Sequence, residues 1–197
     1  PTDISQKTDV EKLIQSAIDS FGRIDILVNN AGIGNMAPFT EMTDDKRDEV
    51  WSTNIKGTWD CCQAVLPHMI KHNYGRIINI SSVTGPMVAN AGWTAYAASK
   101  GAISGFTRAL ALDLAQYGIT VNAICPGWIK RDTQDTGKDA DAHRAKLNAS
   151  IPLGRVGEPE EVGDLAVFLA SDSASYITGT ETVIDGGNIL QEKKGDF

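Results

Sequence analysis

The sequence is poor in cysteine and histidine, and this scarcity excludes several classes of site. Its 197 residues contain three cysteines, Cys61, Cys62 and Cys125, two of which are neighbours. An odd number with this spacing provides neither a disulfide framework nor a four-ligand zinc site. His68 and His72 have helical spacing but no recognisable third ligand. We therefore expect reduced, structural cysteines and no metal site.

Long apolar runs and clusters of basic residues are also missing. No stretch approaches the ~18 apolar residues that a membrane-spanning helix requires. Lys and Arg number 18 against 25 Asp and Glu, which gives a net charge of −7. Binding to nucleic-acid phosphates needs clustered positive charge, and the basic residues here are scattered. We expect a soluble, cytoplasmic protein with neither a nucleic-acid nor a membrane partner.

The remaining composition, 42% hydrophobic and 22% charged, is that of an ordinary globular chain, so we expect one domain over residues 1–197. Apolar periodicity and turn residues predict these elements in order: a helix over 8–21, a strand over 24–28, a helix from Thr43 or Asp44 to about His72, a strand over 76–80, a helix over 94–117, a strand over 119–124, a helix from Pro159 and a strand over 182–184. Alternating helices and buried strands predict an α/β fold, a doubly wound parallel sheet with helices on both faces.

Two local patterns refine this interpretation. Thr8 to Glu11 has the spacing of a capping box, which predicts that the first helix begins there. The residues from Lys130 to Pro152 are expected to form a polar loop, whose acidic part over 132–141 is expected to be solvated.

A glycine pattern after the first predicted strand resembles a dinucleotide fingerprint without its context. Gly32-x-Gly34-x-x-Ala37 has the right spacing, but Pro38 follows and no helix starts there. We expect the true glycine-rich turn, with about 60 residues of βαβ structure, to precede Pro1. The strand over 24–28 would then lie beside a strand that this chain does not contain, with an apolar edge unpaired.

Tyr96 and Lys100 carry the strongest chemical signal. They are four residues apart on a predicted helix, so their side chains share one face. A free phenol titrates near pH 10, and a neighbouring ammonium stabilises the phenolate, which acid–base catalysis near neutral pH requires. Ser82 follows a buried strand, where open α/β sheets place their ligands. Asn54 interrupts a helix in which Asn is unfavourable, so we expect its side chain to have a partner.

These residues fall within motifs that resemble, in order and spacing, the short-chain dehydrogenase/reductase family. The motifs are Asn29-Asn30-Ala31-Gly32, Asn54-Ile55-Lys56-Gly57, the segment 75–82, Tyr96-Ala97-Ala98-Ser99-Lys100, the segment 122–127, and Ile177-Thr178-Gly179 with Asp185-Gly186-Gly187. The resemblance covers essentially the whole chain.

The resemblance implies a catalytic role for four residues. Tyr96 is expected to be the general acid/base and Ser82 to orient the substrate carbonyl. Lys100 is expected to bind the nicotinamide ribose and to favour ionised Tyr96. Asn54 is expected to hold a water in the proton relay.

The resemblance also implies that NAD or NADP is bound. The residues expected around the cofactor are Asp3 and Ile4 at the adenine, Asn30, Ala31 and Gly32 on the side of the adenosine ribose, and Pro126, Gly127 and Ile129 at the nicotinamide, together with Tyr96 and Lys100. A threonine is common in the family where this chain has Arg131, so the contacts there are left open.

The function implied is hydride transfer between NAD(P)(H) and a secondary alcohol, polyol or ketone. Reduction of a 3-oxoacyl carrier protein is the alternative substrate class, and a catalytically silent folding or oligomerisation unit is the alternative of another kind. Trp93 and Trp128 are either walls of the substrate pocket or core residues. The apolar helices around Trp59 and over 95–114, with the resemblance, predict a homotetramer.

Overall fold

The computed structural model describes residues 1–130 and 140–191, without the side chains of residues 140–143. Arg131 and residues 132–139 of the expected acidic loop therefore lie outside the described residues. None of the helices in the described ranges is both long and apolar enough to cross a membrane.

In the described residues, four parallel strands form one sheet, as predicted. They are β1 (Ile26–Asn29), β2 (Gly75–Ile80), β3 (Ile119–Pro126) and β4 (Glu181–Ile184), and they lie in the order β1-β2-β3-β4. Apart from their last residues, β2 and β3 are buried throughout. Strands that are covered on both faces are rich in Ile and Val for this reason.

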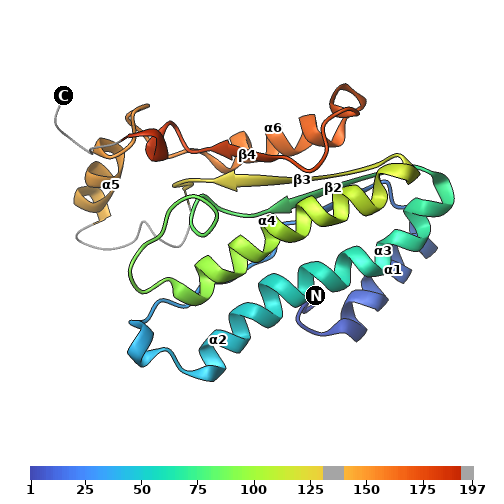
Figure 1. The fold of residues 1–197 in the computed structure, drawn as a ribbon, viewed down its shortest axis with the longest axis horizontal. Coiled ribbons are helices and arrows are strands. Elements are labelled where there is room, and N and C mark those ends of the chain that lie inside the picture. Colours follow the sequence, from blue (N-terminus) through green and yellow to red (C-terminus); the bar gives the residue numbers. More distant parts are fainter. Residues whose placement is uncertain (131–139, 192–197) are drawn as a thin grey trace.

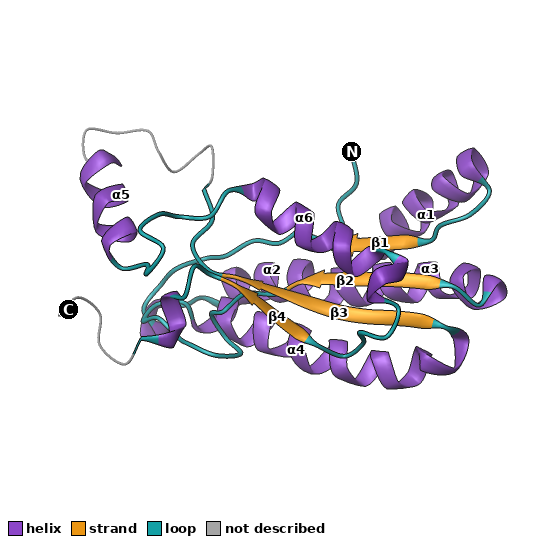
Figure 2. Ribbon diagram, turned by 90° about the horizontal axis from the view of Figure 1, so that it is seen from above, coloured by secondary structure: helices purple, strands orange, loops and turns teal. Residues whose placement is uncertain are grey.

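Helices cover both faces of the sheet. They are α1 (Lys7–Phe21), α2 (Asp44–Trp51), α3 (Thr58–His72), α4 (Thr94–Leu114), α5 (Ala140–Ala149) and α6 (Pro159–Ala170), with a π-helical turn over Ser52–Gly57 and 3-10 turns over Phe39–Glu41, Ala115–Tyr117, Asp172–Ala174 and Asn188–Leu190. Figure 1 shows α6 above the sheet and α1, α3 and α4 below it, and Figure 2 shows α6 in front of the sheet. The doubly wound α/β fold is therefore confirmed.

Side chains alternate between the two faces along each strand. Ile77 and Val121 join the larger core, which contains α1, α3 and α4. Ile78 and Ile124 face the other way and pack against Leu169 of α6. The alternation follows from the two-residue repeat of an extended chain.

The last crossover of the sheet differs from the two before it. The strands follow one another in a single direction, and α3 and α4 connect them across the same face. The helix α6 connects β3 to β4 across the opposite face, so this crossover has the opposite hand. Since right-handed crossovers are the rule, the β3–β4 connection is the unusual one.

The strand β1 is an edge of the described sheet, and one of its faces is bare. Ile26 and Val28 are 49% and 44% exposed, whereas Leu27 on the other face packs against the larger core. Val28 is in register with Ile78, which packs against Leu169 of α6, yet Val28 itself stays exposed. The edge position of this strand agrees with the expectation from the sequence.

Two local predictions are wrong. The first helix begins at Lys7 with Gln6 as its cap, so Thr8 lies inside it and caps nothing. A turn in which Gln6 N–H bonds Asp3 O starts the helix earlier than the sequence indicated. The segment from Lys130 to Pro152 is also not all loop, because its described part contains α5, whose polar sequence gives little apolar periodicity.

Candidate active site

The predicted site residues gather at the carboxyl ends of the strands. Ser82 lies just beyond β2, where the backbone continues along β3: Ser81 N–H bonds Ile124 O at 2.8 Å and Val83 N–H bonds Pro126 O at 3.1 Å. Asn30 directly follows β1. This edge is where open α/β sheets bind their ligands.

Tyr96 and Lys100 share one face of α4, as their spacing predicted. The ammonium of Lys100 lies 5.6 Å from the centre of the Tyr96 ring. It donates a 2.7 Å hydrogen bond to Ile80 O, the last carbonyl of β2. Lys100 is only 6% exposed, so a positive charge is held beside the phenol in a desolvated position.

Asn54 has the partners that its place in a helix requires. Its Oδ1 accepts a 2.9 Å hydrogen bond from Ile33 N–H, and its Nδ2 donates to Ile33 O and to Ser99 Oγ, both at 2.9 Å. Ser99 in turn donates to Tyr96 O at 2.7 Å. Asn54 therefore ties the segment after β1 to the first turn of α4, which carries the predicted acid/base.

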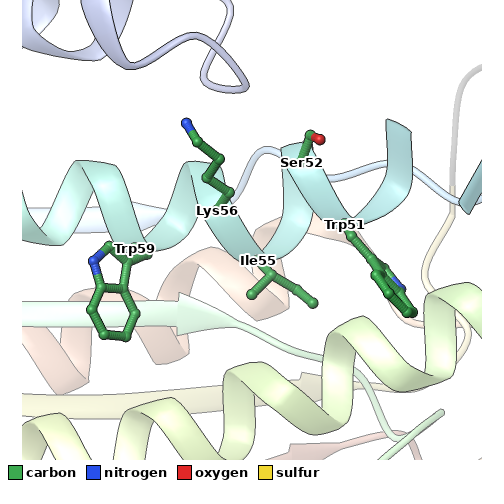
Figure 3. Close-up of a pocket in the computed structure, with 5 residues that line it drawn as sticks. All are labelled: Trp51, Ser52, Ile55, Lys56 and Trp59. Carbon is green, nitrogen blue, oxygen red and sulfur yellow. The ribbon is translucent and has the colours of Figure 1, made fainter. Parts of the chain in front are cut away.

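The π-helical turn around Asn54 is the irregular part of the α2–α3 helix. Figure 3 shows Trp51, Ile55 and Trp59 on the side toward α4, while Ser52 and Lys56 point away. Trp51 donates from Nε1 to Ala95 O at 3.1 Å, and the Trp59 ring lies 5.2 Å from that of Phe106. The five residues drawn in Figure 3 line a shallow surface depression outside the catalytic edge.

Ser82 has a defined hydroxyl position. The side chain is buried, and its Oγ accepts a 3.0 Å hydrogen bond from Thr84 N–H. A hydroxyl that accepts one bond can still donate its own hydrogen. The group is thus oriented by its own turn and keeps a donor for a substrate oxygen.

The residues expected around the nicotinamide continue from β3. Gly127 N–H bonds Ile184 O at 2.9 Å, and a Cβ at Gly127 would lie 2.6 Å from Asp185 Cβ, so this position has room only for glycine. Ile129 pairs with Gly157 in a short bridge. Pro126 ends the strand and stands opposite Ile184.

The residues expected at the adenine lie near the start of α3. Ile4 packs against Gly57, where a Cβ would lie 2.8 Å from Ile4 Cδ1. Asp3 is exposed and accepts a 2.9 Å hydrogen bond from Ser5 N–H. Hydrogen bonding to Ser5 lowers the pKa of the Asp3 carboxyl below its usual value.

The segment Asn30 to Gly32, expected on the side of the adenosine ribose, lies open at the carboxyl end of β1. All three of its residues are exposed. A Cβ at Gly32 would stand 3.3 Å from Asn54 Oδ1 and 3.5 Å from Lys100 Nζ. The glycine therefore leaves the space beside Asn54 and Lys100 free of a side chain at this position.

The pattern Gly32-x-Gly34-x-x-Ala37 does not open a helix, as the sequence analysis argued. Ala37 is buried and its N–H bonds Gly92 O, and the next α-helix starts only at Asp44. Gly34 lies against Trp93, which meets the Tyr96 ring edge-on with centroids 5.4 Å apart. Trp128 is 42% exposed, so it is not a core residue.

Two side chains that anchor α4 were not predicted from the sequence. Ser99 links Asn54 to Tyr96 O, and Ser81 donates from Oγ to Lys100 O at 3.0 Å. Each is buried, and Ser99 lies in the middle of a helix, where serine is a weak helix former. A polar residue at such a position was the available signal.

The three cysteines are free and buried, in agreement with a structural role. Burial raises the pKa of the Cys62 thiol to about 12 and that of Cys125 to about 11, which disfavours the reactive thiolate. Over the described ranges, the structure holds no group of three metal-ligating side chains.

Comparison with known proteins agrees with this geometry. The sequence model of a family described as "Enoyl-(Acyl carrier protein) reductase" matches residues 1–188. The chain is 48% identical over 196 residues to oxidoreductase UcpA of Escherichia coli, covering 96% of this chain and 74% of that protein. It is 42% identical over 187 residues to the 3-oxoacyl-[acyl-carrier-protein] reductase FabG of Thermotoga maritima, covering 95% and 75%.

A solved structure extends the likeness to three dimensions. The gluconate 5-dehydrogenase of Burkholderia cenocepacia J2315, in complex with NADP and tartrate, superposes with a TM-score of 0.89 at 34% identity. The match covers 96% of this chain and 74% of that chain. Together with the site geometry, these matches show that the chain belongs to the short-chain dehydrogenase/reductase family of NAD(P)-dependent oxidoreductases.

Proposed function

We propose that Tyr96 is the general acid/base in hydride transfer between NAD(P)(H) and a secondary alcohol, polyol or ketone. The observation that carries the proposal is the buried Lys100 ammonium, 5.6 Å from the Tyr96 ring at the carboxyl edge of the sheet. Both groups stand at the edge where open α/β sheets bind their ligands. Tyr96 can then take a proton from an alcohol or return it to a forming alkoxide.

Ser82 and Asn54 complete the proton-handling group. Ser82 Oγ, held by Thr84 N–H, is positioned to donate to the substrate oxygen. The amide of Asn54 is engaged by Ile33 and Ser99, so its first effect is to fix the distance between the segment after β1 and α4. The water expected at Asn54 in the proton relay would bind to its backbone carbonyl within the π-helical turn, where the regular hydrogen-bond ladder is broken.

The bound nicotinamide supplies or accepts the hydride, and the protein places the substrate carbon against it. Lys100 would hold the nicotinamide ribose, and the exposed segment Asn30 to Gly32 would border the cofactor on the side of the adenosine ribose. Pro126, Gly127 and Ile129 would hold the nicotinamide, and Asp3 with Ile4 would border the adenine.

The substrate is proposed to be a small free molecule. The relation to a gluconate 5-dehydrogenase supports a polyol or its ketone, and the relation to a 3-oxoacyl-carrier-protein reductase supports a 3-oxoacyl thioester. A carrier protein that is itself acidic would have to dock on a basic surface, and the chain has a net charge of −7. The charge balance therefore favours the small substrate.

The test is oxidation of NADPH or NADH, followed at 340 nm, with 5-oxogluconate and with a 3-oxobutanoyl thioester. Turnover of 5-oxogluconate supports the proposal, and turnover of the thioester alone supports the alternative. No dinucleotide binding by fluorescence titration, in a folded sample, would favour a catalytically silent folding or oligomerisation unit.

Tyr96→Phe removes the acidic hydroxyl and keeps the ring. We expect kcat to fall by about 10²–10⁴-fold while dinucleotide affinity is maintained. Tyr176→Phe, at an exposed tyrosine, is the matched control and should leave turnover unchanged. Near-native turnover in Tyr96→Phe would refute the assignment.

A further inference from the structure

Trp93 and the predicted acid/base Tyr96 both lie against a glycine, Gly34. Trp93 directly precedes α4, and its ring meets the Tyr96 ring edge-on, with centroids 5.4 Å apart and planes at 73°. A Cβ at Gly34 would lie 2.7 Å from Trp93 Cζ3 and 3.2 Å from Tyr96 Cδ2, so the tighter contact would be with Trp93. A contact of 2.7 Å between carbon atoms is well inside van der Waals distance.

Space, and not backbone conformation, explains the glycine at position 34. Gly34 is absent from the residues with positive φ, so an ordinary side chain would meet no backbone strain there. Its neighbour Ile33 is held at both N–H and C=O by Asn54. The backbone under Trp93 therefore cannot retreat without breaking these two bonds.

We propose that Trp93 is a positioning residue that fixes the Tyr96 ring. The Trp93 ring can occupy its position because Gly34 has no side chain. The proposal rests on the proposed role of Tyr96. Trp93 and Tyr96 are both only partly buried, so the edge of the indole is one of the contacts that limit the movement of the phenol ring. A displacement of about 1 Å in a reacting group can cost about 10²-fold in rate. A methyl group added at Gly34 would push Trp93 and so displace Tyr96.

The test is a double-mutant cycle of Gly34→Ala and Trp93→Phe. Gly34→Ala should lower kcat about 10²-fold with a much smaller change in KM, because the ring moves and the substrate site remains. Trp93→Phe removes the outer ring of the indole and should cost less than about tenfold. In the Trp93→Phe background, the 2.7 Å contact is relieved and only the milder 3.2 Å contact with Tyr96 Cδ2 remains, so Gly34→Ala should cost only about two- to threefold more.

A second measurement needs no substrate. With ¹³C-labelled tyrosine, the Tyr96 resonance is assigned among the four tyrosines by its loss in Tyr96→Phe. Gly34→Ala should shift this resonance in the unmodified protein and shift it much less in the Trp93→Phe background. If Trp93 had only a structural role, its substitution would change the melting temperature, and the shift caused by Gly34→Ala would be the same in both backgrounds.

The matched control is Gly163→Ala on α6, where a Cβ meets no atom within 4 Å. It should change neither kcat nor the Tyr96 resonance. If Gly34→Ala alone does not fold, restored folding and turnover in the double variant supports the proposal, and a double variant that is equally unfolded overturns it.

Two outcomes overturn the role of Trp93: an equal loss from Gly34→Ala in both backgrounds, or an unshifted Tyr96 resonance in Gly34→Ala. Failure of the proposed function would look different. Tyr96→Phe would keep its turnover, while the shift of the Tyr96 resonance caused by Gly34→Ala would still depend on Trp93.

Discussion

Asn54 is the residue on which the geometry of the candidate site depends most. It is 1% exposed and satisfies three buried polar groups, on Ile33 and on Ser99. Leaving such groups without partners costs about 1–3 kcal/mol each in proteins. The residue therefore combines a structural function with its place in the proposed proton relay.

Asn54→Ala should lower the free energy of unfolding by about 2–5 kcal/mol, since a methyl group replaces none of the three bonds. Chemical denaturation followed by circular dichroism measures the change. Ser52→Ala, in the same π-helical turn but pointing away from α4, is the control and should be nearly neutral. An Asn54→Ala variant within about 0.5 kcal/mol of the parent would contradict the assigned contacts.

Part of the candidate site could be predicted from the sequence alone. Tyr96 and Lys100 could be paired because four residues span one helical turn, and Ser82 could be placed because it follows a strand. The partners of Asn54 could not be found, because Ile33 and Ser99 are 21 and 45 residues away in the sequence. Contacts at that separation depend on the packing of whole elements.

At the scale of elements, the π-helical turn determines how the side chains of α2 and α3 are rotated relative to each other about the helix axis. In a regular α-helix, residues 51 and 59 would point about 80° apart, and one additional residue reduces this angle to about 20°. Both tryptophans therefore reach α4, at Ala95 and at Phe106. Periodicity predicted one long helix here, because a single additional residue barely alters an apolar pattern.

The first turn of α6 contains a pH-sensitive cap. Glu161 accepts hydrogen bonds from Arg155 and from Glu158 N–H, and these bonds lower the pKa of its carboxyl to about 2, from an ordinary 4.5. A lowered pKa in the folded state stabilises the protein above the pKa of the unfolded chain. This stabilisation is lost as the pH falls from about 4.5 through about 2.

We therefore expect Glu161→Gln to lower the melting temperature at pH 6 and to have progressively less effect between pH 4.5 and pH 2. Glu160→Gln, on the same exposed turn, serves as the control for helix-end charge and should show a weaker dependence on pH. A difference between Glu161→Gln and the parent that stays constant down to pH 2 would show that the Arg155 contact is unimportant.

At the scale of the whole molecule, the outer face of α3 and α4 is the proposed contact between subunits. Trp59 is 53% exposed and Leu112 is 81% exposed, and Trp51 borders the same depression (Figure 3). Large exposed apolar surfaces of this kind mark interfaces. We propose that this face forms one pairwise interface of a homotetramer, with a second pairing elsewhere.

Light scattering at micromolar concentration should give the mass of a tetramer. Trp59→Glu with Leu112→Glu should produce smaller species, because two charges would be buried at the interface. Tyr176→Glu, at an exposed aromatic residue outside this face, should leave the mass unchanged. A monomeric parent protein would refute the proposal.

The bare face of β1 gives a separate prediction for a sample of these 197 residues alone. An unpaired strand with exposed Ile26 and Val28 is a template for association. Val28→Lys should reduce turbidity on heating without changing the circular dichroism spectrum. Val167→Lys, at an exposed valine of α6, should not reduce it, and equal turbidity in both variants would exclude the β1 edge as the cause.

The opposite hand of the β3–β4 crossover has a consequence for the order of folding. Right-handed strand–helix–strand crossovers form readily because the twist of the strands and the handedness of the helix favour the same path. The β3–β4 crossover lacks this local preference. The 54 residues between β3 and β4 also make their pairing the most distant in sequence among the strand pairs of the described sheet, and such contacts form slowly. We expect β4 to dock last, on a sheet that is already formed. Asn122, which donates from Nδ2 to Ile177 O and accepts from Thr180 N–H, would then gain these bonds only at the end, and the backbone amides that join β4 to β3 should exchange with solvent earliest in the described sheet.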